Sequence, residues 1–161
     1  MVNEIRACTE SDFDRMYRII NAAATRYEGV IPADRYHQPY MPESELRREM
    51  KRMNFSGWVE EGALLGVMGL EPVKDVSLIR HAYVLPEHQN KGIGSKLLEE
   101  AKSKFTGKQL LVGTWADAYW AVDFYKKHGF RLCPDKDVLL RTYWDVPDRQ
   151  IETSVVLELI N

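Results

Sequence analysis

The stretch that decides the fold is Val84-Leu85-Pro86-Glu87-His88-Gln89-Asn90-Lys91-Gly92-Ile93-Gly94-Ser95. A strand-like segment stops at Pro86, because proline has no N–H to donate to a strand ladder, and a glycine-rich helix start follows. The N-terminus of a helix exposes unpaired amide N–H groups and carries partial positive charge, so it binds phosphate. Gly92 and Gly94 remove side chains where an anion approaches the backbone, and Lys91 adds a positive charge. The stretch predicts a strand, a turn and an anion-binding helix start.

Two other phosphate-binding loops do not fit this turn. The dinucleotide pattern G-x-G-x-x-G fails because Lys96 and Leu97 stand where a third small residue is needed. The P-loop pattern fails because no Gly-Lys-Ser/Thr follows Gly92 and Ile93. A helix start with glycines and no ligand is the plain alternative for this turn taken alone.

A second segment downstream reads Ala121-Val122-Asp123-Phe124-Tyr125-Lys126-Lys127-His128-Gly129-Phe130. It resembles the A-x-x-F-Y-x-x-x-G-F segment of the GCN5-related N-acetyltransferase (GNAT) family. The turn, written Val84-x-Pro86 and Gln89-x-x-Gly92-x-Gly94, resembles the pyrophosphate-binding motif of the same family. The two motifs stand in the family's order, and the resemblance spans nearly the whole chain. It implies an acetyl-CoA-dependent N-acetyltransferase.

The resemblance also implies where acetyl-CoA, as cosubstrate, would lie. Parallel strands at 76–84 and 109–114 would splay apart, and the backbone near Ala82 and Val84 would pair with the pantetheine arm. Amides from Gln89 through Ser95 would hold the pyrophosphate. Tyr125 matches a tyrosine that protonates the leaving thiolate, a role that suits a phenol; the alternative is packing beside Phe124. The residues expected at the cofactor are Ala82, Tyr83, Val84, Gln89, Asn90, Lys91, Gly92, Ile93, Gly94, Ser95 and Tyr125.

The general base is left open by the sequence. Some relatives carry a Glu or His on the strand before the turn, where this chain has Leu78 and Arg80. His81 is adjacent, but strand alternation places it with Ile79 and Tyr83 on the other face, so a structural histidine is expected unless a bulge redirects it. The other candidates are a water chain, Glu28, Asp34, His37 and Glu71.

Two further positions bear on the chemistry. Many relatives have an asparagine where this chain has Ala118, so that one cofactor contact is missing. Cys133 is expected to be a small buried residue, the usual role of a free cysteine, and direct transfer from CoA to an amine needs no acyl-cysteine. Without a clear base, a non-catalytic acyl-CoA-binding or regulatory domain of the same fold is the alternative function.

The acceptor is expected to be an amine of a small molecule or peptide. The segment Tyr27–Met41, with Arg80, Tyr143 and Trp144, is expected to contact it. This surface mixes aromatic residues with both signs of charge and has no acidic trough suited to a polyamine or a basic peptide. The last strand could pair across an interface, which makes a homodimer possible.

The order of elements indicates one N-acetyltransferase domain over residues 1–161. Early hairpins followed by alternating strands and helices predict an α/β (α+β) fold: a mixed, mostly antiparallel sheet with helices on both faces. A Thr9–Asp12 capping box is expected to start the first helix, and Asp117 to cap a later one that ends at Gly129. Strands are expected at 4–8, 57–60, 63–70, 76–84, 109–114, from 130 to 133 and at 154–160; helices after 9, at 42–53 and after 92 and 117; a long loop at 28–41; and a short helix or loop at 135–144.

Composition excludes several classes of protein. A net charge of −2 gives no global basic field for nucleic acid. Two cysteines, Cys8 and Cys133, with no nearby histidine cluster exclude a disulfide framework and a metal site. The chain has no apolar run of signal-peptide type at its start and none of the roughly 20 residues needed to cross a bilayer. A cytoplasmic protein without membrane partners is expected.

Overall fold

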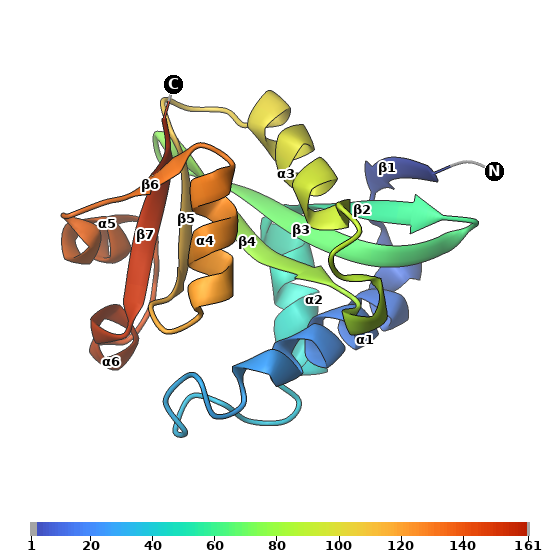
Figure 1. Cartoon of the computed structure of the whole chain (residues 1–161), viewed down its shortest axis with the longest axis horizontal. Coiled ribbons are helices and arrows are strands. Elements are labelled where there is room, and N and C mark those ends of the chain that lie inside the picture. Colours follow the sequence, from blue (N-terminus) through green and yellow to red (C-terminus); the bar gives the residue numbers. More distant parts are fainter. Residues whose placement is uncertain (1–2, 161) are drawn as a thin grey trace.

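The strands form one mixed sheet in the order β1-β2-β3-β4-β5-β7-β6 (Figure 1). The computed structural model describes residues 3–160, so residues 1, 2 and 161 of the expected domain lie outside the described part. Every neighbouring pair is antiparallel except β4 and β5, which are parallel. The predicted mixed, mostly antiparallel sheet is confirmed. The strands are β1 (Asn3–Ala7), β2 (Asn54–Glu60), β3 (Ala63–Val73), β4 (Val76–Val84), β5 (Leu110–Trp115), β6 (Phe130–Leu132) and β7 (Ser154–Leu159).

Helices cover both faces of this sheet, as predicted. A Cβ on Gly66 of β3 would meet Ile93 and Leu97 of α3, whereas one on Gly69 would meet Met53 at the end of α2. Figure 1 shows α3 and α4 on one side of the sheet and α2 behind it. The longer helices are α1 (Phe13–Ala24), α2 (Glu43–Arg52), α3 (Ile93–Lys104), α4 (Tyr119–Lys127), α5 (Lys136–Tyr143) and α6 (Asp148–Glu152), with 3-10 turns at Glu10–Asp12, Thr25–Tyr27 and Pro86–His88.

The parallel pair β4–β5 is short, and this shapes the molecule. Pairing covers Ser77 with Leu110, Leu78 with Leu111 and Ile79 with Val112, and goes no further. Beyond those three pairs the two strands separate, although β4 runs on to Val84. The splay predicted for strands 76–84 and 109–114 is therefore present, and the C-terminal half of β4 has β3 on one side and a gap on the other.

A β-bulge interrupts the pairing of β4 with β3 in this C-terminal half. Gly69 of β3 pairs with Arg80, but Val67 pairs with Tyr83, so one extra residue lies in β4 between them. His81 sits in the bulge with φ +55°, a left-handed conformation that is uncommon outside glycine. The simple alternation predicted for His81 is therefore wrong: both His81 and Arg80 reach the carboxylate of Glu49.

Most boundaries agree with the sequence-based expectation, and the differences have local causes. The strand predicted at 76–84 is confirmed, and the helix or loop predicted at 135–144 is the helix α5. The strand predicted at 57–60 starts earlier, at Asn54, because β2 pairs with β3 along its whole length. Asp117 does not cap α4; Ala118 occupies the N-cap position. The short helix α6 was not predicted.

The first helix begins at a network of charged hydrogen bonds. Asp12 accepts the backbone N–H of Thr9 at 2.8 Å, which is one half of the predicted capping box. Both oxygens of the same carboxylate accept hydrogen bonds from Arg6, at 2.8 and 2.9 Å. These bonds tie the end of β1 to the start of α1. Among residues 3–160, no helix is long and apolar enough to cross a bilayer.

Candidate active site

A cleft lies between α3, α4 and the free half of β4, and we call it the α3–α4 cleft. Seven of the eleven residues predicted at the cofactor line it together. Tyr27 and Trp120 also line this cleft, and their ring centroids lie 6.1 Å apart in a stacked arrangement. The guanidinium carbon of Arg26 lies 4.2 Å from the centroid of the Trp120 ring. The seven predicted residues are Ala82, Tyr83, Val84, Gln89, Asn90, Gly94 and Tyr125.

The turn at the mouth of this cleft presents a run of free amides. Among residues 3–160, no backbone group accepts the N–H groups of residues 90–95; the first helical bond is from Lys96 to Gly92. Asn90 and Gly92 take left-handed conformations, with φ +65° and +84°, and residues in this conformation are common in backbone turns that bind anions. No atom lies within 4 Å of a Cβ built on Gly92. The turn therefore suits a pyrophosphate held by backbone N–H groups.

The other four predicted cofactor residues do not line the cleft with their side chains. Ile93 is buried in the core, and Lys91 is exposed and lies 3.4 Å from His88. Ser95 makes a 3.0 Å hydrogen bond to His128. These residues, with Gly92, can contribute backbone N–H groups to the turn. The chain itself is held there by Gln89, whose side-chain amide donates to the carbonyl of Val84 at 3.1 Å.

Tyr125 connects the α3–α4 cleft to a second one, the central cleft, where β4 and β5 separate. Its side chain is 5% exposed and contacts both spaces. Burial raises the pKa of Tyr125 well above its ordinary value of 10, so the phenol stays protonated at neutral pH. A protonated phenol can donate a hydrogen ion, which is consistent with the acid role that the resemblance implies.

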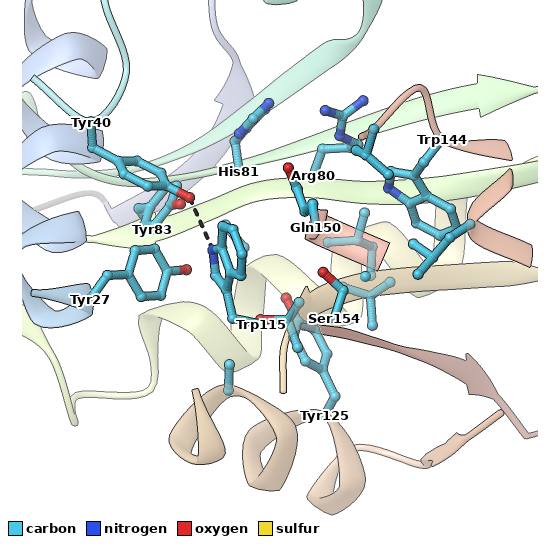
Figure 2. A pocket seen from close by; sticks show the side chains of 18 residues that line it. Tyr27, Tyr40, Arg80, His81, Tyr83, Trp115, Tyr125, Trp144, Gln150 and Ser154 are labelled. Carbon is cyan, nitrogen blue, oxygen red and sulfur yellow. Dashed lines mark hydrogen bonds between the residues drawn. The ribbon is translucent and has the colours of Figure 1, made fainter. Parts of the chain in front are cut away.

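Aromatic hydroxyl groups gather at the other end of the central cleft (Figure 2). The rings of Tyr27 and Tyr40 lie 5.3 Å apart, and the ring of Tyr83 lies 6.4 Å from Tyr27. The indole N–H of Trp115 donates to the Tyr40 hydroxyl at 3.2 Å. Burial raises the pKa values of all three tyrosines, so this wall is polar but uncharged.

A polar recess borders the central cleft on the side of α2, and we call it the α2 recess. Glu49 of α2 is only 6% exposed and lies at its base. The carboxylate accepts hydrogen bonds from His81 at 3.1 Å and from Arg80 at 3.4 Å. Figure 2 shows Arg80 and His81 pointing away from Tyr125, on the opposite side of the central cleft. We call the place where β4 and β5 separate the fork. Its two sides therefore differ: the free amides and Tyr125 lie on one side, and charged groups lie on the other.

The predicted base candidates lie at different places. His37 and His81 line the α2 recess. Glu71 is buried and paired with Arg80 at 3.0 Å, and Asp34 is exposed and lies 3.6 Å from Arg149. Of the predicted acceptor residues, Tyr27, Tyr40, Arg80 and Trp144 line the central cleft, whereas Tyr143 instead donates to Asp75 at 2.7 Å.

Sequence reasoning missed Glu49 and Trp115. Glu49 follows Leu46 by three residues, so it shares the buried face of α2, and a charged residue on an apolar face is the signal that could have found it. Trp115 ends β5, one residue past the predicted strand, and its role depends on the distant Tyr40.

The remaining predicted positions agree with their expected roles. Ala118 is fully buried against Ile31 and Trp115. Cys133 is 5% exposed, and its thiol donates to Glu158 at 3.1 Å. Burial raises the pKa of Cys133 to about 12, which disfavours a nucleophilic thiolate.

Comparison with protein-family models matches residues 54–132 to the acetyltransferase (GNAT) domain. Over this stretch, just under half of its length, the chain is similar to GNAT acetyltransferases. The matched residues begin at β2 and end at β6, and they include the turn, Tyr125 and the fork between β4 and β5. The family resemblance read from the two motifs is confirmed, and acetyl-CoA is the cosubstrate of this family.

Solved structures with the same fold are numerous. The PaiA N-acetyltransferase of Thermoplasma acidophilum, solved with coenzyme A, is 19% identical with a TM-score of 0.74, and all of both chains align. An acetyltransferase of Streptococcus agalactiae is 15% identical with a TM-score of 0.72, covering 99% of this chain and 98% of that one. The ribosomal-protein-S18-alanine N-acetyltransferase of Escherichia coli is 18% identical with a TM-score of 0.68, covering 98% and 93%. A comparison with curated protein sequences finds no match.

Proposed function

We propose that this chain, as one domain over residues 1–161, transfers the acetyl group of acetyl-CoA directly to an amine of a small molecule or peptide. The observation that carries the proposal is the run of free amides at residues 90–95, placed at the mouth of a cleft that leads to a gap in the sheet. A pyrophosphate satisfies such amides, and an extended amide chain suits an unpaired strand.

Backbone groups of two segments would hold the donor. Amides of residues 90–95 would hold the pyrophosphate, and the free edge at Ala82–Val84 would pair with the pantetheine arm. Gly94 has no side chain beside the turn, and a Cβ built on it would contact only the ring of Phe124, at 3.5 Å. When bound, acetyl-CoA supplies an activated thioester at the fork.

The transfer needs two proton movements, and the fork has a group on each side for them. A C–N bond to the acceptor amine forms as the C–S bond breaks, the amine nitrogen loses a proton, and the sulfur gains one. Tyr125, which is buried and protonated, would donate the proton to the sulfur. On the α2 side, His81 is oriented by Glu49, which fits it or a neighbouring water to receive the amine proton.

A binding measurement followed by a transfer measurement tests this function. Acetyl-CoA and CoA should raise the melting temperature of the protein, and an amine panel should release CoA measured with a thiol reagent. The control is adenosine at the same concentration, because adenosine lacks the pyrophosphate. No thermal shift with millimolar acetyl-CoA would refute the proposal.

A non-catalytic acyl-CoA-binding domain is the second candidate. It is favoured by one observation: neither Leu78 nor Arg80, the positions predicted for a strand base, can take a proton at neutral pH. This candidate predicts tight binding of acetyl-CoA with no transfer to any amine. The same two measurements separate it from the enzyme.

A further inference from the structure

The α2 recess is rich in arginine, in a chain whose net charge is −2. It shares a wall with the central cleft through Tyr40, Arg80, His81 and Trp115, so a molecule in the recess can reach the fork. The arginines lining the recess are Arg35, Arg48, Arg52 and Arg80, and the histidines are His37 and His81.

Two of these arginines are already neutralised. Arg80 lies 3.0 Å from Glu71 and 3.4 Å from Glu49. Arg52 lies 3.2 Å from Glu71 and 3.4 Å from Glu49. The four groups form a closed network of two positive and two negative charges, and this network supports the recess without requiring a ligand.

Arg35 and Arg48 have no such partner. None of the ion pairs found over residues 3–160 includes either of them. The Nε atom of Arg35 is buried and has no hydrogen-bond acceptor in that part of the chain. A buried donor without an acceptor is costly, and the planar guanidinium group matches the two oxygens of a carboxylate or phosphate.

The recess also presents negative charge. Glu45 and Asp145 line it, and neither takes part in an ion pair within residues 3–160. Glu45 and Tyr40 both line the recess, and Tyr40 also lines the central cleft. A ligand with positive charge alone would leave two arginines facing it, and one with negative charge alone would face two carboxylates.

We propose that the acceptor is a small zwitterionic amine, whose anionic group is bound by Arg35 and Arg48 while its amine extends past Glu45 and Tyr40 to the fork. An amino acid or an aminoalkyl phosphate has this chemistry. The inference rests on the proposed acetyl transfer, since it assigns the acceptor of that reaction. It separates such amines from polyamines, which carry no anion.

Matched pairs of amines test the proposal through CoA release. Lysine is compared with cadaverine, which is the same amine without the carboxylate, and phosphoethanolamine with ethanolamine. We expect the anionic member of at least one pair to have the higher kcat/KM, and the pair that differs tells carboxylate from phosphate. Arg48→Gln, and Arg35→Gln separately, should lower that kcat/KM about 10- to 100-fold, mostly through KM.

Lys51→Gln is the matched control, because Lys51 is an exposed cation on α2 that does not line the recess. The control should leave kcat/KM for the same amine unchanged. Arg35→Lys keeps the charge but loses the planar guanidinium group, so it should recover only part of the activity. All variants should keep the wild-type KM for acetyl-CoA.

Binding of the same amines to the protein–CoA complex, measured by calorimetry, separates this proposal from the transfer reaction. If lysine or phosphoethanolamine binds, and Arg48→Gln weakens it, the recess assignment holds even if no acetyl transfer occurs. If cadaverine and ethanolamine are bound or acetylated as well as their anionic partners, the assignment is overturned while acetyl transfer stands. Equal losses in Arg48→Gln and Lys51→Gln would overturn it too.

Discussion

Replacing Glu49 with glutamine should destabilise the protein by an amount that depends on pH. The glutamine keeps the shape of the side chain and one acceptor oxygen, but it removes the charge that His81 and Arg80 contact at 3.1 and 3.4 Å. A hydrogen bond to a charged group contributes about 1 kcal/mol more than a neutral one, so two of them amount to about 2 kcal/mol. Arg80 retains Glu71, which keeps the loss below that of an isolated buried charge.

Thermal unfolding at pH 7 is the assay. For a chain of this size, about 2 kcal/mol corresponds to a fall in Tm of about 4–8 °C. The matched control is Glu45→Gln, one turn earlier on α2, where no ion pair is lost among the described residues. Equal Tm values for the two variants would contradict the assignment of Glu49 as the charge that holds the bulge.

The pH dependence gives a second, independent check on the Glu49 prediction. Burial alone would raise the pKa of Glu49, but the hydrogen bond from His81 and the nearby Arg80 and Arg52 outweigh it, so the net pKa lies below its ordinary 4.5. A lowered pKa contributes stability above the unfolded value, and this contribution is lost as pH falls through the folded value. The Tm gap between wild type and Glu49→Gln should therefore be full at pH 6–7 and close at acid pH. A gap that stays constant would refute the reasoning.

Three further outcomes are expected. Tyr125→Phe should lower kcat by about 100-fold or more with little change in Tm; unchanged turnover would show that the hydroxyl is not the acid. Gly69→Ala should cost about 1–3 kcal/mol in chemical denaturation, because its Cβ would lie 2.8 Å from the carbonyl oxygen of Arg80, whereas Gly66→Ala meets only side chains at 3.0 Å or more and should cost less. Asp12→Asn should cost about 1 kcal/mol at neutral pH; because the hydrogen bonds from Arg6 lower the pKa of Asp12, the difference should vanish as pH falls through that lowered value.

The fold and the donor side of the site were largely predictable from local sequence. Pro86, the glycines of the turn and the segment around Tyr125 each impose a local structure, so their placement depends little on distant residues. The mixed sheet with helices on both faces followed from the order of elements, and the splayed parallel pair followed from the family resemblance.

The acceptor side was not predictable in the same way, because it is built from residues far apart in the chain. Whether His81 follows the alternation of β4 depends on its register with β3, and one inserted residue reverses the face. Glu49 lies on a helix 32 residues before His81, so no local pattern joins them. Arg35 belongs to a long loop, whose path no periodicity describes.

The short pairing between β4 and β5 has a consequence for how the protein behaves in a crowded solution. An unpaired strand edge normally attracts strands of other molecules, and proteins guard such edges against aggregation. Here the open edge of β4 lies in the interior of the sheet, between its own neighbours β3 and β5, instead of at its rim. The unpaired stretch of β4 backbone is therefore flanked by the protein's own strands, and it lacks the rim position at which strands of other molecules pair.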